Sequence, residues 1–155
     1  MIKVITAQIP EQGMEFSGDC LEDIFTDLID DRCKDVSPLM YDLHLQIVRG
    51  DLVVKGKSTV IVDAICDCCL VEYEEVIDIE NLCHVIEKVD DVVDLTESLR
   101  EDIVLAIPQS YICRDGCQGI CDGCGKNLNK EECICADVEL AEDSPWSGLG
   151  DIKFD

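Results

Sequence analysis

Hydrophobic and polar residues alternate with a period of two along residues 39–48, which is the clearest pattern in the chain. The apolar positions are Leu39, Tyr41, Leu43, Leu45 and Ile47. This alternation predicts a strand with one buried face. Residues 2–9, 52–66 and 71–80 are also β-compatible, and a turn is expected at 49–51. Because short connections favour antiparallel pairing, we expect an antiparallel, curved or barrel-like sheet of about five strands.

Two other stretches show the apolar spacing of a helix. Asp19 with Glu22, and Asp94 with Glu97, each form a capping-box pattern at the start of such a stretch. Pro108 should end the second helix near residue 106. The apolar stripes are Leu21, Ile24, Phe25, Leu28 and Ile29 in the first helix, and Leu95, Leu99, Ile103 and Ile107 in the second. The predicted fold class is therefore α+β, with two helices and a C-terminal cysteine-rich zinc module.

The composition changes after Gln109, from apolar residues to Cys, Gly, Asp and Asn. A segment so poor in apolar residues cannot form a core of its own without a cross-link. We therefore expect an α+β core domain over residues 1–108, a cysteine-rich zinc-binding module over 109–136, and an acidic, partly ordered tail over 137–155.

Six of the 12 cysteines fall between residues 113 and 135. Cys121 and Cys124 form a C-x-x-C pair followed by Gly125, and Cys133 and Cys135 supply a second pair. Four thiolates at about 2.3 Å satisfy a tetrahedral zinc ion without an open position. The spacing therefore predicts a zinc site, although it equally permits an iron–sulfur cluster.

A further C-x-x-C pair, Cys66 and Cys69, lies at the end of a predicted strand. Together with Cys113 and Cys117 it would complete a second four-thiolate set, so the chain would hold one or two zinc ions. The same spacing also suits a buried thiol pair without a ligand role. A redox pair is a third alternative, but the βαβ surroundings of a thioredoxin-like site are missing.

The remaining chemistry-bearing residues give no sign of catalysis. Cys20, Cys33 and Cys83 are isolated and are expected to pack on apolar faces. Cys83 and His84 are a weaker ligand candidate, and neither His84 nor His44 has a visible nucleophile or acid partner. Motifs of serine hydrolases, phosphate loops and dinucleotide sites are absent from the sequence. We therefore expect that the protein is not an enzyme.

The chain is strongly acidic, with 12 Lys and Arg against 35 Asp and Glu and a formal net charge of −23. Such a surface repels phosphate, so binding to naked RNA is disfavoured and a basic partner is attracted. Residues 71–102, with 12 acidic and 2 basic side chains, are the expected docking face. We find neither an export signal nor an apolar run of about 20 residues, so we expect a cytoplasmic protein with reduced thiols and no membrane contact.

Several motifs after Gly50 occur in an order typical of one known family. A C-x-R-C-L-like sequence is followed by D-L-T-E, by a helix that ends in A-[IL]-P, and by C-G-x-N-L-N. The matching residues are Cys66, Cys69, Leu70, Asp94, Leu95, Thr96, Glu97, Leu105, Ala106, Ile107, Pro108, Cys113, Cys117, Gly119, Cys121, Cys124, Gly125, Asn127, Leu128, Asn129, Cys133 and Cys135. In these motifs, and in the closing stretch from Asp143 to Leu149, the chain resembles the YceD family. That family is also catalogued as a domain of unknown function and as the large ribosomal RNA subunit accumulation protein.

The resemblance implies a role in the synthesis, processing or stability of large-subunit ribosomal RNA. Cys68 stands where the family has Arg, and Pro145 replaces the Arg of the closing motif, so two cations that could contact RNA are missing. We therefore expect a non-enzymatic ribosome-biogenesis factor that acts through a basic ribosomal protein or a pre-ribosomal particle. The alternative is a metal-binding or thiol-redox protein in which the cysteines themselves are the function.

Overall fold

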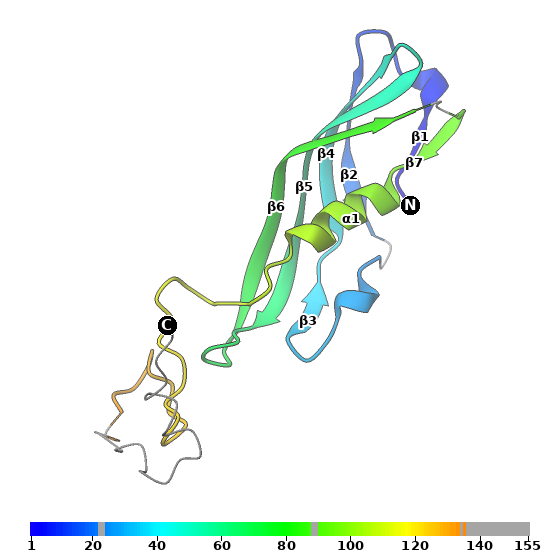
Figure 1. Ribbon diagram of the computed structural model, residues 1–155. Coiled ribbons are helices and arrows are strands. Elements are labelled where there is room, and N and C mark those ends of the chain that lie inside the picture. The colour runs from blue at the N-terminus through cyan, green and yellow to red at the C-terminus, as the bar shows by residue number, and fades with distance from the viewer. Residues whose placement is uncertain (22–23, 88–89, 134, 136–155) are drawn as a thin grey trace, which may run out of the picture.

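The computed structural model describes residues 1–21, 24–87, 90–133 and 135 (Figure 1). Within these residues, strands predominate and one α-helix is present. The elements in chain order are β1 (Lys3–Ile5), the 3-10 turn η1 (Thr6–Gln8), β2 (Met14–Cys20), the 3-10 turn η2 (Thr26–Leu28), β3 (Cys33–Val36), β4 (Leu39–Val48), β5 (Asp51–Ile65), β6 (Glu72–Ile86), β7 (Val92–Asp94) and α1 (Thr96–Ala106).

Five strands form an antiparallel sheet that is built around β5. β4 and then β3 pair with one edge of β5, β6 pairs with its other edge, and β2 pairs with β4. Among the described residues, the separate strands β1 and β7 pair only with each other. The alternation in 39–48 produces the buried face of β4, where Leu39, Leu43 and Leu45 are fully buried. The expected antiparallel sheet is thus confirmed, but the described strands do not close into a barrel.

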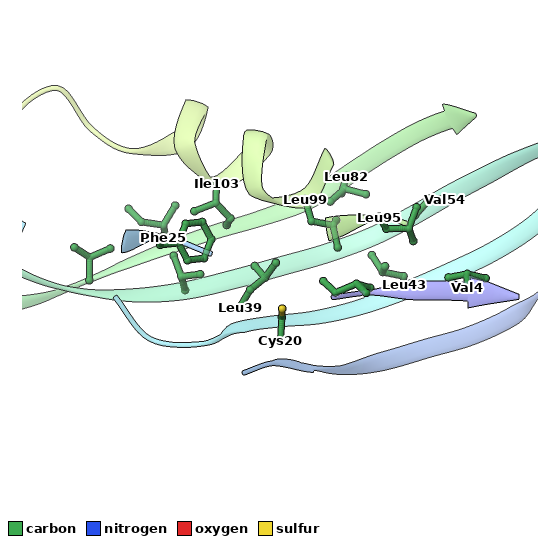
Figure 2. Packing of buried hydrophobic residues seen from close by; sticks show 14 of the residues in the cluster. Val4, Cys20, Phe25, Leu39, Leu43, Val54, Leu82, Leu95, Leu99 and Ile103 are labelled. Carbon is green, nitrogen blue, oxygen red and sulfur yellow. The ribbon is translucent and has the colours of Figure 1, made fainter. Parts of the chain in front are cut away.

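The core lies between this apolar face of the sheet and α1. Figure 2 shows Leu95, Leu99 and Ile103 directed from the helix toward the strands, where they meet apolar side chains of β4, β5 and β6. All three are almost completely buried. The Asp94 carboxylate accepts a hydrogen bond from the N–H of Thr96, the first residue of α1 (3.0 Å), and so satisfies one of the backbone donors that a helix start leaves unpaired.

The end of α1 agrees with the sequence prediction. Ile107 has an extended backbone (φ −60°, ψ 127°) because the ring of the following Pro108 disfavours the helical conformation there. The chain then runs to the cysteine-rich segment, which Figure 1 shows beyond the end of the sheet where the β5–β6 turn lies. In the described part of the chain, no helix is both long and apolar enough to span a bilayer.

The helix predicted from Asp19 is wrong. Asp19 and Cys20 end β2, where they pair with Met40 and Leu39 of β4. Of the described residues among 21 and 24–29, only 26–28 form a single 3-10 turn. Strand pairing with β4 therefore overrides a local helical pattern that is too short to be stable on its own. In the apolar stripe of that pattern Leu21 is 82% exposed, so the stripe does not pack as one face.

Gly56 lies within β5 rather than between two strands. Its φ of +154° is accessible to glycine, and a Cβ there would lie 2.1 Å from the Asp42 carbonyl oxygen of β4. On the other side of β5 the register shifts between Gly56 and Ser58, so Glu80 and Asn81 of β6 together face one residue of β5. This bulge bends β6 and divides it into residues 72–79 and 82–86.

Candidate metal centre

Two turns of the same shape present the C-x-x-C pairs. After Cys66, the Leu70 N–H donates to the Cys66 carbonyl (2.9 Å) and the Cys66 N–H donates to the Val71 carbonyl (2.9 Å). After Cys121, the Gly125 N–H donates to the Cys121 carbonyl (2.8 Å) and the Cys121 N–H to the Lys126 carbonyl (2.8 Å). Each turn needs a positive φ at its fifth residue, which is 56° at Leu70 and 72° at Gly125. Both turns therefore bring two sulfurs to one side of the chain.

The proximal cluster joins the β5–β6 turn to the segment after α1. Cys66 and Cys69 come from the turn and are buried, whereas Cys113 and Cys117 come from the later segment and are partly buried. The sulfurs of Cys66 and Cys117 lie 3.9 Å apart, and those of Cys69 and Cys113 lie 3.6 Å apart. Residues that are more than forty positions apart in the sequence thus meet at one point.

The distal cluster lies within the cysteine-rich segment itself. Its members are Cys121, Cys124, Cys133 and Cys135, of which Cys124 is exposed and the others are partly buried. The sulfur of Cys133 lies 3.1 Å from that of Cys121 and 3.6 Å from that of Cys124. The sequence predicts eight cysteine ligands. The structure brings these eight cysteines together in two sets of four, and all sulfurs of a set lie within 4.8 Å of one another.

These distances fit one ion per cluster. A tetrahedron with metal–sulfur bonds of about 2.3 Å has edges of about 3.8 Å, close to the separations in the proximal cluster. A disulfide would require about 2.05 Å, and all 12 cysteines are free thiols. Both clusters could therefore hold a metal ion through four sulfurs, and the residues present are those that soft or borderline divalent ions prefer.

The electrostatics of the proximal cluster favour at least one thiolate. Burial opposes ionisation of Cys66, yet backbone N–H groups of Cys113, Cys69 and Cys68 point at its sulfur and lower its pKa from 9.0 to about 6. Burial and the neighbouring thiols raise the pKa of Cys113 to about 12. The four sulfurs thus do not all ionise together in the absence of a cation.

The distal cluster likewise contains one cysteine with a lowered pKa and another with a raised pKa. The hydrogen bond from the Cys133 thiol, with backbone N–H groups of Cys124 and Gly123, lowers the pKa of Cys121 to about 7. Hydrogen bonding to Cys124 and Cys133 raises the pKa of Cys135 to about 12. A divalent ion among four such sulfurs would remove the remaining protons, because thiolates are its ligands.

Asn127 and Asn129 connect the two clusters. Both lie in the loop between the pairs of the distal cluster, but the Asn129 side-chain amide donates to the Cys117 sulfur (3.4 Å) and that of Asn127 donates to the Cys69 carbonyl (3.2 Å). The Asn129 carbonyl oxygen also accepts the Gln118 N–H (2.9 Å). The loop of one cluster therefore orients a candidate ligand of the other, in the position that outer-shell groups take at metal sites.

The cysteine-rich segment is also fastened to the sheet by Asp67, which lies inside the first C-x-x-C turn. Its backbone N–H donates to the Tyr111 carbonyl (2.8 Å) and its carboxylate accepts the Tyr111 N–H (2.9 Å). Tyr111 is buried under the Arg32 guanidinium, which lies 5.9 Å from the ring centroid. Hydrogen bonds thus hold the β5–β6 turn against the segment after α1 next to the proximal cluster.

Sequence reasoning did not assign roles to Asn127, Asn129 or Asp67. Asn127 and Asn129 belong to the C-G-x-N-L-N motif, which marked them as matching residues without saying what they contact. Their partners lie in segments that only the folded chain brings near. In the sequence, Asp67 could be suspected of a role at the site only because it lies between two predicted ligands.

The remaining cysteines and histidines lie outside both clusters. Cys20 and Cys33 are buried in the core, as expected, whereas Cys83 is exposed, so its predicted packing is wrong. Successive side chains of a strand point to opposite faces, and His84 accordingly points to the helix side, where it contacts the Asp102 carboxylate at 2.6 Å. Cys83 and His84 therefore do not form a joint ligand pair. His44 contacts the Glu15 carboxylate at 2.8 Å, so the expectation that neither histidine has an acid partner is wrong.

Residues 71–102 are divided among three elements of the structure. They make up β6 at an edge of the sheet, then β7 beside β1, and then the first half of α1. The tail residues 137–155, with the closing motif from Asp143 to Leu149, lie outside the described residues, as does residue 134.

Comparison with known proteins finds a family similarity in the C-terminal part of the chain. The model of the family described as "Large ribosomal RNA subunit accumulation protein YceD" matches residues 80–153. A relative from Arabidopsis thaliana, named "Large ribosomal RNA subunit accumulation protein YCED homolog 1, chloroplastic", is 34% identical over 61 residues. This alignment covers 39% of the present chain and 18% of the relative. No solved structure gives a significant match.

The resemblance to the YceD family is thereby confirmed. The matched residues include α1, the distal cluster and half of the proximal cluster, but they exclude β1 to β5 and the first C-x-x-C turn. The names of the family and of the relative both refer to accumulation of the large ribosomal RNA subunit.

Proposed function

We propose that this chain, a YceD-like protein over residues 80–153, is a non-enzymatic factor that supports the synthesis, processing or stability of large-subunit ribosomal RNA. The family match is the observation that carries the proposal. A chain with a net charge of −23 is a poor ligand for RNA phosphates. We therefore propose that it acts through a basic ribosomal protein, free or in a pre-ribosomal particle, in the cytoplasm.

The two cysteine clusters are proposed to hold one zinc ion each. Four thiolates complete the tetrahedral shell of zinc and leave no open position for a substrate, which supports a structural rather than a catalytic site. Iron–sulfur clusters distribute their cysteine ligands over several irons, whereas four sulfurs within 4.8 Å of one another would suit a single ion, which supports zinc. In this role the ion of the proximal cluster stabilises the attachment of residues 113–117 to the β5–β6 turn.

The second candidate function is thiol redox chemistry or metal handling. The low pKa values of Cys66 and Cys121, about 6 and 7, are the specific observation in its favour, because thiolates are the reactive form of cysteine. Exposed Cys68 beside the proximal cluster would supply an accessible thiol. On this alternative the cysteines would cycle at cytosolic potentials, and loss of the thiols would abolish function without affecting folding.

A complementation experiment tests the main proposal. In cells that lack the chain we expect large-subunit ribosomal RNA to fall relative to small-subunit RNA, with precursors accumulating, and the wild-type gene to restore the ratio. The Cys83→Ser variant is the control, since this exposed thiol lies outside both clusters. An unchanged RNA ratio in the deletion strain would reject the proposed function.

The same strains separate the two candidate functions. A variant with Cys121 and Cys124 replaced by Ser should lose the distal ion and be degraded or misfolded, so its RNA defect should track the amount of folded protein. If that variant remains folded and abundant but the defect persists, the thiols themselves are required and the redox alternative is favoured. Thiol labelling of wild-type protein before and after mild oxidation provides the direct readout.

A further inference from the structure

The outer edge of β6 has no partner strand among the described residues. β6 spans Glu72–Ile86 and pairs only with β5, along its other edge. Figure 1 shows it as the outermost long strand of the sheet, on the side away from β2. Away from its ends, no backbone hydrogen bond between described residues reaches that outer edge. An open strand edge offers N–H and C=O groups to an added strand.

The part of this edge before the bulge is acidic. Residues 72–79 contain Glu72, Glu74, Glu75 and Asp78 but no Lys or Arg. Glu72, Glu74 and Asp78 are exposed and alternate along the strand, so they lie on the sheet face opposite the core. Val76 lies between them, is 57% exposed and adds an apolar contact surface.

Like charges extend from this edge across the sheet. Asp63 of β5 pairs directly with Glu74 of β6 on one side and with Asp35 of β3 on the other. All three side chains are exposed. Directly opposed like charges destabilise a sheet, and Lys34 of β3, which lines the same surface pocket as Asp63 and Glu74, offsets part of this repulsion. A cation beyond β6, next to Glu74, would offset the repulsion.

The negative charge of β6 also determines which kind of molecule can bind its outer edge. A second copy of the chain would place another acidic β6 against the first, which repulsion disfavours. Naked RNA is repelled for the same reason. An extended peptide segment with Lys or Arg at alternate positions would instead place cations beside Glu72, Glu74 and Asp78 while its backbone continues the sheet.

We propose that the outer edge of β6 at residues 72–79 binds an extended basic peptide segment as an additional antiparallel or parallel strand. Main-chain hydrogen bonds provide affinity, and the alternating carboxylates select alternate basic residues. The bulge at Glu80 and Asn81 interrupts the edge and ends the added strand. The partner's identity as a ribosomal protein rests on the proposed function, whereas the strand addition does not.

A pair of synthetic peptides tests strand addition directly. One peptide alternates lysine and valine, and its control replaces alternate valines with proline, which keeps the charge but cannot continue a sheet. Binding to the full chain is measured by fluorescence anisotropy. We expect the proline peptide to bind at least about tenfold more weakly, because main-chain pairing is lost. Hydrogen exchange should show slower exchange of the amides in residues 72–79 only with the lysine–valine peptide.

Matched variants test the position of the site. The variant Glu72→Gln, Glu74→Gln, Asp78→Asn should weaken binding of the lysine–valine peptide about tenfold. The control variant Glu11→Gln, Glu15→Gln, Asp19→Asn removes the same charge in and beside β2, at the opposite edge of the sheet, and should bind as the wild type does. Both variants replace exposed side chains, and their melting temperatures verify that they are folded.

Equal affinity for the two peptides, or protection of β2 instead of β6, would overturn the proposal. So would an equal loss of affinity in both variants, which would mean attraction by net charge alone. The peptide experiment does not depend on RNA levels. If it fails while the deletion strain still loses large-subunit RNA, strand addition is rejected and the proposed function stands. If the peptide binds at β6 but the deletion strain is normal, the proposed function is rejected instead.

Discussion

The candidate cysteine ligands are the residues whose arrangement the sequence predicts best, because a C-x-x-C turn is a local structure. Each turn closes through hydrogen bonds within six residues and a positive φ at its fifth position. Glycine favours a positive φ, so the sequence predicts this conformation at Gly125. Leu70 adopts a positive φ although its bulky side chain disfavours it. In the sequence, the only reason to group Cys66 and Cys69 with Cys113 and Cys117 is that eight cysteines would fill two four-thiolate sites. That these residues bind metal stays a prediction.

Asn129 is a residue whose importance only the fold reveals, and it gives a direct prediction. In an Asn129→Ala variant the proximal cluster should bind zinc about 10–100-fold more weakly, because the amide that orients Cys117 is lost. Chelator competition on the purified protein measures this affinity. Asn81→Ala, at an exposed site in β6, is the control. Equal affinities in the two variants would show that Asn129 does not support the cluster.

Gly56 provides a second prediction at the residue scale. Gly56→Ala should lower the free energy of unfolding by about 2–4 kcal/mol, since its Cβ would overlap the Asp42 carbonyl oxygen in addition to straining the backbone. Gly50→Ala also has a positive φ but meets no atom within 4 Å, so it should cost only about 1 kcal/mol. Urea unfolding of both variants measures the difference. Similar losses would mean that the close strand contact is absent.

At the scale of elements, the sequence predicts β4 and α1 but misjudges the segment between Met14 and Leu28. The alternation of β4 and the apolar stripe of α1 span enough residues to identify each element. Residues 14–20 carry only a weak alternation, with Gly18 inside it, and become a strand because β4 offers a paired edge. Such pairing is a tertiary effect that local patterns do not contain.

Packing of α1 against the sheet can be tested with two leucines of the same helix. Leu99 is fully buried and Leu105 is 84% exposed. Leu99→Ala should lower the free energy of unfolding by about 2–5 kcal/mol, because it leaves a cavity under the helix. Leu105→Ala should change it by less than about 0.5 kcal/mol. A comparable loss in both variants would contradict the position of α1 in the core.

At the scale of the whole molecule, the two clusters form one continuous unit at the end of the sheet. The proximal cluster ties the β5–β6 turn to the segment after α1, and Asn127 and Asn129 tie the distal loop to the proximal cluster. The described residues 113–133 contain no strand or helix of their own. Backbone turns and side-chain hydrogen bonds hold them in place rather than an apolar core, and we expect metal ions in the two clusters to add to this.

Removal of metal should accordingly affect one part of the molecule. We expect chelation to increase amide hydrogen exchange in residues 113–133 strongly, while β4 and β5 remain protected by the core. The wild-type protein with zinc restored is the control. Loss of protection throughout the sheet would instead mean that the ions support the entire fold.

The central claim is that each cysteine set holds one zinc ion, and elemental analysis tests it most directly. Protein purified without added metal should contain two zinc ions per chain, one for each set. Cys66→Ser and Cys124→Ser should each retain one ion, and Cys83→Ser should retain both. Wild-type protein that contains no metal, yet protects its amides in residues 113–133 from exchange, would contradict the account.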